Sequence, residues 1–292
     1  MDAGLHTAHS LQSLPVELLY EVFIFSAWHQ FPHTCKHLYS VCRNAPSSVT
    51  AEYLLARHAD DQGLVKPGGA LITRILRYPV CTQPVLDALF RLPEYTRAAP
   101  DTAGTIELPR RLFRPLSPRS TRPWGAHDRP LPFLRYLFAH PRMPRPNANC
   151  WDGYALTRAV AAGFVPLVQF LLAHGASPAC KGGIAVLAAV RRKNLPLVKM
   201  LIEPDANPAM ATDAEKGAEG TAQGVVKGKR QRQDEAVVAR RGHKKRRLED
   251  RIAVSQEMLR TAVGCDARDI VKYFMEEKSC MPDMQTVRMM RG

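Results

Sequence analysis

The stretch DGYALTRAVAAGFVPLVQFLLAHGASP, residues 152–178, predicts a pair of short helices, one from YALTRAVAAG and one from PLVQFLLAHG. Pro166 stands at the start of the second helix, where a proline sacrifices no backbone hydrogen bond. The leucines and valine that follow it recur at helical spacing and form one apolar face. This pair of helices is the unit with which the rest of the chain can be compared.

Three further segments are similar to the second helix of this pair. They begin at Pro132, Pro196 and Asp269 and read PFLRYLFAHP, PLVKMLIEPD and DIVKYFMEEK. Each starts with proline, or with an aspartate that can cap free backbone amides. Successive starts, counted with Pro166, are 34, 30 and 73 residues apart. Two short helices per unit at a period of roughly 33 residues are typical of stacked repeats.

A recurring alanine supports the same interpretation. The segments YALTRAVAAG, IAVLAAVRRK and QEMLRTAVGC precede three of the four helix starts. Seven residues before each of these starts lies an alanine followed by valine, at Ala159, Ala189 and Ala262. Because antiparallel helices in close contact need a small residue where they meet, we expect these alanines at the helix–helix contact.

Residues 150–208 resemble the ankyrin repeat. The likeness includes the Asp-Gly turn at 152–153, the Gly163 helix end and the His-Gly-Ala after the second helix. It implies an all-α solenoid that buries its core by stacking and presents one concave face to a target protein. The remaining units are less regular, and the stretch from Ala70, ALITRILRYPVCTQPVLDALFRL, is a degenerate early repeat. A generic helical bundle, in which any leucine-rich helix superposes on another, remains the alternative.

Between the starts at 196 and 269 the chain has about forty residues more than one repeat needs. The excess, 209–251, is polar, glycine-spotted and free of aromatic residues, so we expect a flexible insertion. It carries much of the net charge of +14, in two clusters that resemble a bipartite nuclear localisation signal read by importin. A solvated charge run and nonspecific contact with nucleic-acid phosphates are the alternatives. The residues of the two clusters are Lys227, Lys229, Arg230, Arg232, Lys244, Lys245, Arg246 and Arg247.

The N-terminal stretch SLPVELLYEVFIF, residues 13–25, predicts a helix that is apolar over a wide arc. Together with TCKHLYSVC at 34–42, it resembles the F-box. The resemblance implies binding of a Skp-type adaptor of a cullin-RING ubiquitin ligase, with the rest of the chain selecting the substrate. The contacts would come from Leu14, Pro15, Leu18, Leu19, Val22 and Phe23. Alternatively, this helix only caps the solenoid.

Other classes of function have little support in the sequence. No phosphate-binding loop, no GxSxG motif and no framed carboxylate pair occurs, so we expect neither catalytic residues nor a cofactor. His29, His33, Cys35, His37 and Cys42 crowd together, but their spacing fits no common zinc site. Glu17 and Glu21 argue against a signal peptide, and no apolar run suits a membrane span. Seven cysteines without a CxxC pair suggest reduced intracellular thiols.

Together these patterns predict an all-α protein that acts through binding. We expect the substrate receptor of an SCF-type ubiquitin ligase, nuclear and also present in the cytoplasm. A nuclear ankyrin-repeat scaffold without a ligase role is the alternative. The expected parts are an F-box-like motif at 10–46, degenerate ankyrin-like helices at 50–149, ankyrin repeats at 150–208, the basic insertion at 209–251 and a C-terminal ankyrin-like repeat at 252–292.

Overall fold

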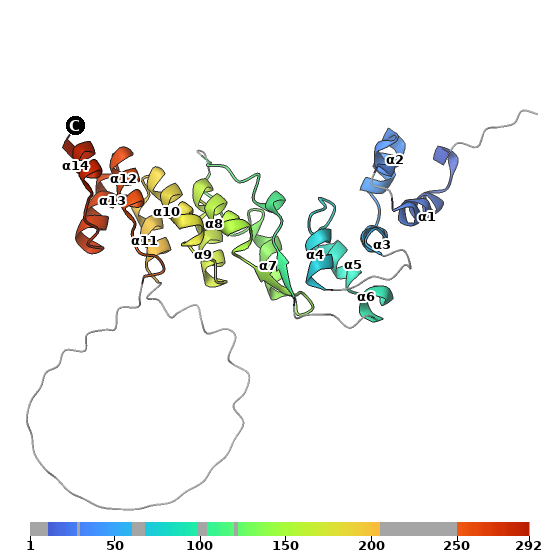
Figure 1. Ribbon diagram of the computed structural model, residues 1–292. Helices are drawn as coiled ribbons and strands as arrows, with labels where there is room; N and C mark the ends of the chain where they lie inside the picture. Colours follow the sequence, from blue (N-terminus) through green and yellow to red (C-terminus); the bar gives the residue numbers. More distant parts are fainter. Residues whose placement is uncertain are drawn as a thin grey trace, which may run out of the picture. The chain divides into compact units, whose positions relative to one another are not determined.

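The computed structural model describes residues 11–27, 30–59, 68–97, 104–119, 122–204 and 250–291. The described chain is mostly helical (Figure 1), which confirms the predicted helical class. It divides into two compact units, Met1–Ala188 and Ala189–Gly292. The division falls within a helix, at none of the boundaries predicted from the sequence. No helix in the described ranges is both long and apolar enough to cross a membrane.

The first unit is a succession of short helices. Its first part holds α1 (Val16–Ser26), α2 (Lys36–Arg43), α3 (Ser47–Ala56), α4 (Gly69–Ile75), α5 (Gln83–Leu89) and α6 (Pro93–Arg97). Its second part holds α7 (Leu131–Ala139), α8 (Cys150–Ala162) and α9 (Val165–Ala173), and α10 (Cys180–Arg191) continues across the boundary between the units. The degenerate repeat predicted from Ala70 thus contains two helices, α4 and α5, whose leucines and isoleucines are buried.

A short parallel strand pair was not predicted. β1 (Thr105–Glu107) pairs with β2 (Arg145–Asn147), with Ile106 opposite Pro146. The irregular segment after β1 packs its Leu108, Phe113 and Leu116 into the core. The guanidinium of Arg158 on α8 donates hydrogen bonds to the carbonyls of Phe113, Arg114 and Leu116, so a side chain satisfies backbone that forms no regular structure.

The predicted helix starts are confirmed to within one residue. The helices α7, α9, α11 (Leu195–Ile202) and α13 (Arg268–Lys272) each begin one residue before the predicted proline or aspartate. The recurring alanines Ala159, Ala189 and Ala262 are all fully buried, as expected of positions where two helices meet. Because protein interiors are densely packed, a larger side chain at any of these positions would have to displace its neighbours.

The first helix of each repeat, which is α8, α10 or α12 (Gln256–Gly264), ends in the same way. Gly163, Lys193 and Asp266 all have a left-handed backbone, with φ of 72°, 52° and 49°. The next residue in each case donates its amide to the carbonyl of the recurring alanine, at 2.9 Å, 3.3 Å and 3.0 Å. This is the geometry of a helix C-cap that glycine normally favours. The repeat therefore keeps its backbone where the glycine expected from the pattern is replaced by lysine or aspartate.

The turn that leads into the first helix is also the same in two repeats, at α8 and at α10. Residues 151–153 before the body of α8 and residues 181–183 before that of α10 are three consecutive left-handed residues each. The Asn149 side chain ties the first of these turns to the loop after α9. Its Nδ2 donates to the carbonyl of Gly175 at 2.9 Å, and its Oδ1 accepts from the amide of Ser177 at 2.7 Å.

The second unit is built from two separated parts of the chain. Its helices after α11 are α12 (Gln256–Gly264), α13, a π-helix at Tyr273–Glu277 and α14 (Met284–Arg291). The amide of Arg251 donates to the carbonyl of Ile202 at 2.7 Å, and its guanidinium donates to the carbonyl of Met200 at 2.7 Å. The described residues on the two sides of 205–249 therefore lie next to each other, while 205–249 itself is outside the described residues.

Candidate partner-binding site

The helix α1 carries four of the six residues predicted to bind a partner, Pro15 is its N-cap, and Leu14 lies just before it. The six residues do not share one environment. Pro15 and Leu18 are exposed, and Leu14 and Val22 are half-buried. Leu19 and Phe23 are buried, with 1% and 5% of their surface exposed.

Leu19 and Phe23 form the inner stripe of α1. The ring of Phe23 stacks on Tyr53 of α3 with centroids 3.9 Å apart, and it lies 6.1 Å from the ring of Phe31. These contacts place both residues in the core of the N-terminal helix cluster, which extends beyond residue 46 to include α3. In this conformation a partner cannot reach Leu19 or Phe23.

The outer stripe of α1 consists of Leu18, Val22 and Phe25, which follow one another at i, i+4 and i+7. Leu18 is 44% exposed and Phe25 is 84% exposed. Residues at this spacing lie on one side of a helix, so their side chains form a single apolar surface. Phe25 was not among the predicted contacts, because it falls off the stripe that contains Leu19 and Phe23. Its spacing from Leu18 was the signal that could have identified it.

A cationic side chain holds the C-terminal end of α1. Ala27 ends the helix with φ of 47°, and its carbonyl accepts a hydrogen bond from Arg57 Nη1 at 2.9 Å. Arg57 also donates from Nε to the hydroxyl of Tyr78 at 2.7 Å. The guanidinium thereby links α1 to α3 and to the loop after α4. This link fixes the end of the helix that carries Phe25.

The second part of the motif, 34–42, forms α2. Its Cys35 caps the helix, with Sγ accepting from the amide of Leu38 at 3.4 Å, and Leu38 and Cys42 are buried. Burial raises the pKa of the Cys42 thiol to about 11, so this thiol stays protonated at neutral pH and is a poor metal ligand. Across the described ranges, no three His, Cys, Asp or Glu side chains gather as a metal site. His29 lies outside those ranges.

The repeats contribute a second candidate surface. Trp151 is exposed at the turn before α8, and its Nε1 donates to the carbonyl of Leu108 at 3.1 Å. The guanidinium of Arg110 lies over the Trp151 ring at 4.6 Å and near the Tyr154 ring at 5.4 Å. Arginine and tryptophan dominate the binding energy of many protein interfaces. This turn is therefore a candidate contact for a target protein.

The predicted nuclear localisation residues, from Lys227 to Arg247, lie outside the described residues. Asp250 and Arg251, the last two residues of the predicted insertion, are described, and both contact the second unit.

No family model, curated protein or solved structure matches this chain.

Proposed function

We propose that this protein is the substrate receptor of an SCF-type ubiquitin ligase, with α1 recruiting a Skp-type adaptor. The observation that carries the proposal is the outer stripe of α1, in which Leu18 and Phe25 stay exposed although Leu19 and Phe23 of the same helix are buried. A helix with apolar residues on both sides, only one of them covered by its own chain, is suited to lie between that chain and a partner. The likeness of 13–42 to the F-box supports a Skp-type adaptor as that partner.

The outer stripe also meets the physical requirement for a docking contact. Exposed leucine and phenylalanine side chains each gain about 1.5–3 kcal/mol on full burial. Leu18, Val22 and Phe25 point to the same side because of their spacing, so one apolar groove on the adaptor can cover all three. The link from Arg57 to Ala27 holds that side in place before binding, which lowers the entropy lost on association.

The test is co-elution of the purified chain with a Skp-type adaptor in gel filtration. Wild type should co-elute, and the double variant Leu18→Asp, Phe25→Asp should not. Val16→Asp is the matched control, because Val16 is also exposed but lies on the opposite side of α1. Binding by the double variant, or no binding by wild type, would refute the proposal. A change at Phe23 is unsuitable, since its burial makes misfolding the expected result.

In this proposal the repeat units hold the protein to be ubiquitinated. The geometry that supports this role is the recurrence of one turn, one buried alanine and one left-handed helix end in successive units. Such units present repeated loops on a shared surface. The chain itself needs no catalytic group, because ubiquitin transfer takes place on other subunits. The target's identity would come from affinity purification with wild type and with the adaptor-blind double variant.

The alternative is a nuclear ankyrin-repeat scaffold in which α1 only covers the N-terminal core. The burial of Leu19 and Phe23 favours it, since both residues perform that structural task. Removing residues 1–45 would destabilise the first unit in either case. The co-elution test with the double variant at Leu18 and Phe25 therefore discriminates better, because under the alternative the variant and wild type behave alike, whereas adaptor recruitment separates them.

We also propose that importin reads the two basic clusters and brings the protein into the nucleus. Eight lysines and arginines in two groups support this role. Residues 205–249 fused to green fluorescent protein should accumulate in the nucleus. The same fusion with Lys244, Lys245, Arg246 and Arg247 changed to alanine should not, and equal distribution of both fusions would contradict import by this signal.

A further inference from the structure

The turns before α8 and α10 bring side chains of two successive repeats together in the first unit. Trp151 and Lys181 each hold the first place of a left-handed turn, with φ of 57° and 51°. A Cβ atom added at Gly153 of the first turn would lie 2.8 Å from Cβ of Cys180, which directly precedes the second turn. The two turns are therefore neighbours. Together with the residues that pack on them they form what we call the turn surface, which consists of Arg110, Trp151, Asp152, Tyr154 and Lys181.

The guanidinium of Arg110 is held in place by aromatic rings while its donors stay unused. It lies 4.6 Å from the centre of the Trp151 ring and 5.4 Å from that of Tyr154. The Trp151 ring is itself fixed, because its Nε1 donates to the carbonyl of Leu108. No hydrogen bond or ion pair joins the Arg110 guanidinium to another residue in the described ranges. A cation ordered in this way loses little entropy when it binds an anion.

The positive charge around the turn surface is poorly compensated within the chain. Residues 104–188 contain eleven lysines and arginines but three acidic residues. Two of the three, Glu107 and Asp128, are already paired with arginines, at 3.6 Å and 3.1 Å. The third, Asp152, belongs to the turn surface and is exposed, but it forms no ion pair with any residue that the structure describes. Unpaired cations therefore outnumber unpaired carboxylates here.

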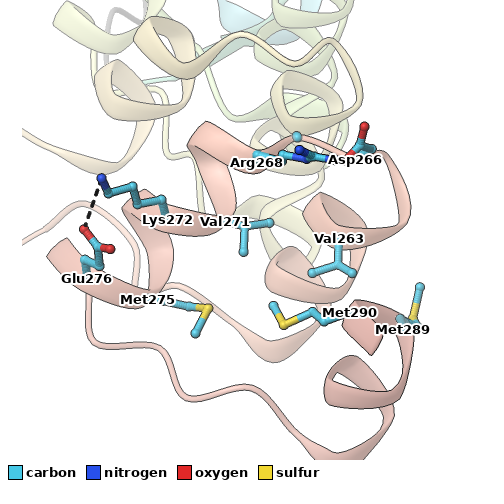
Figure 2. Close-up of a pocket in the computed structure, with 10 residues that line it drawn as sticks. Val263, Asp266, Arg268, Val271, Lys272, Met275, Glu276, Met289 and Met290 are labelled. Carbon is cyan, nitrogen blue, oxygen red and sulfur yellow. Dashed lines mark hydrogen bonds and ion pairs between the residues drawn. The ribbon is translucent and has the colours of Figure 1, made fainter. Parts of the chain in front are cut away.

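The groove between α12, α13 and α14 of the second unit has the opposite arrangement. Figure 2 shows Lys272 paired with Glu276 there, at 3.9 Å, and Arg268 pairs with Asp266 at 3.2 Å. Each of those cations already has a carboxylate partner. Arg110 and Lys181 have none among the described residues, so they can attract the carboxylates of another protein.

We propose that the turn surface binds an acidic segment of the target protein, with one carboxylate on Arg110 and another on Lys181. The inference rests on the proposed function for the role of the repeats as the target-binding part, and it adds the chemistry that the target must present. The planar fork of Arg110 suits two parallel hydrogen bonds to a carboxylate, whereas Lys181 acts as a point charge. Packed helices lie about 8–10 Å apart and an extended chain rises about 3.3 Å per residue, so acidic residues about three positions apart can reach both cations.

Carboxylates fit this surface better than the phosphates of a nucleic acid. Single strands bind by stacking successive bases on exposed aromatic rings along a positive groove. Here the Trp151 ring already carries Arg110, and Tyr154 is half-buried. Asp152 also lies within the surface and repels a continuous row of phosphates. An acidic protein segment can place a neutral residue opposite Asp152.

The probe is a fluorescein-labelled peptide of about twelve residues that alternates Glu and Ser, long enough to span both turns when extended. Fluorescence anisotropy with the full chain in about 150 mM salt should give a dissociation constant of about 10–100 μM. A peptide with Gln in place of Glu should bind about 10-fold more weakly. Because the whole chain carries a charge of +14 and attracts any anion, the comparison of variants decides the test.

The double variant Arg110→Gln, Lys181→Gln should weaken binding of the Glu peptide about 10-fold. The matched control is Arg135→Gln, Arg191→Gln, which removes the same charge from two exposed positions outside the turns and should bind within about 2-fold of wild type. Lys181→Gln alone should bind about 3-fold more weakly, and misfolding would not explain this loss because Lys181 is exposed and makes no described contact. Arg110→Lys should also bind about 3-fold more weakly although it keeps the charge, since lysine lacks the planar fork.

A change at Asp152 should have the opposite sign. Asp152→Asn removes the one carboxylate of the turn surface and should tighten binding of the Glu peptide about 2-fold. Asparagine tolerates the left-handed backbone of this position, where φ is 56°, so the turn is preserved. Unchanged or weaker binding by Asp152→Asn would contradict a contact between the peptide and this turn.

Three further results would overturn the proposal. The first is binding of the Glu peptide by wild type weaker than about 1 mM, and the second is an equal loss of binding in the turn variant and its matched control. The third is tighter binding of an oligothymidylate of the same length, lost in the same double variant, which would assign the surface to nucleic acid. The assay contains no adaptor. A chain that binds the Glu peptide but not the adaptor would therefore support the turn surface and refute only the ligase role.

Discussion

Replacing Lys278 with methionine should destabilise the second unit by about 1–2 kcal/mol. Lys278 Nζ lies 2.8 Å from Asp250 Oδ1 and 3.1 Å from Glu203 Oε1, and its side chain is only 14% exposed. Glu203 also accepts a hydrogen bond from the Tyr273 hydroxyl at 2.8 Å. One ammonium group thus joins the residues on both sides of the segment 205–249.

The magnitude follows from these contacts. Hydrogen bonds to charged groups contribute about 1.5–3 kcal/mol each when buried, but exposed ion pairs contribute only about 0.2–1 kcal/mol. The carboxylates of Glu203 and Asp250 are 40% and 35% exposed, so solvent screens both pairs and the lower part of the range applies. Methionine keeps most of the volume of lysine, which limits the effect to the lost charge.

The assay is urea unfolding followed by far-UV circular dichroism. Lys272→Met is the matched control, because Lys272 is 72% exposed, pairs with Glu276 at 3.9 Å and should contribute less than about 0.5 kcal/mol. If Lys278→Met and Lys272→Met unfold at the same urea concentration, the reasoning is wrong. High salt should reduce the difference between wild type and Lys278→Met, since ions screen the exposed part of each pair.

Acid should reduce that difference as well. Partial burial alone would raise the pKa of Glu203, but hydrogen bonds from Tyr273 and Lys278 outweigh it and hold the pKa below its ordinary value of 4.5. A carboxyl whose pKa is lower in the folded state stabilises the fold fully above its unfolded pKa. That contribution is lost as the pH falls through the folded value. The two proteins should therefore converge in stability as the pH falls from 4.5 through the lowered pKa of Glu203.

Three further predictions concern the repeat units and use the same unfolding assay. Lys193→Gly should stabilise the protein by up to about 1 kcal/mol, because a backbone φ of 52° strains a residue with a side chain but not glycine. Gly163→Ala should destabilise the protein by about 1 kcal/mol for the same reason. The opposite signs would refute the equivalence of the two helix ends. Ala262→Leu should cost about 1–3 kcal/mol by overpacking a fully buried contact, and a neutral result would place this alanine outside the helix–helix interface. Arg158→Met should cost about 1–3 kcal/mol because the carbonyls of Arg114 and Leu116 lose the Arg158 guanidinium as donor. Exposed Arg135→Met should change stability by less than about 0.5 kcal/mol.

The sequence alone determined where the repeat helices begin and which alanines they share. These features are local, since a proline or an aspartate acts on the turn that it starts. The apolar spacing around Ala159, Ala189 and Ala262 likewise depends only on the helical period. The left-handed ends at Lys193 and Asp266 could not be predicted in this way, because neither residue prefers that conformation.

Only the tertiary structure decided which side of α1 remains exposed. Spacing along a helix defines two apolar stripes there, but it contains no information about which one is covered. Tyr53, thirty residues beyond Phe23, covers the inner stripe and leaves Leu18 and Phe25 to solvent. The same holds for Lys278, which meets Glu203 and Asp250 across long separations in the chain. Burial and ion pairing arise from contacts between residues distant in sequence, and those contacts exist only once the chain has folded.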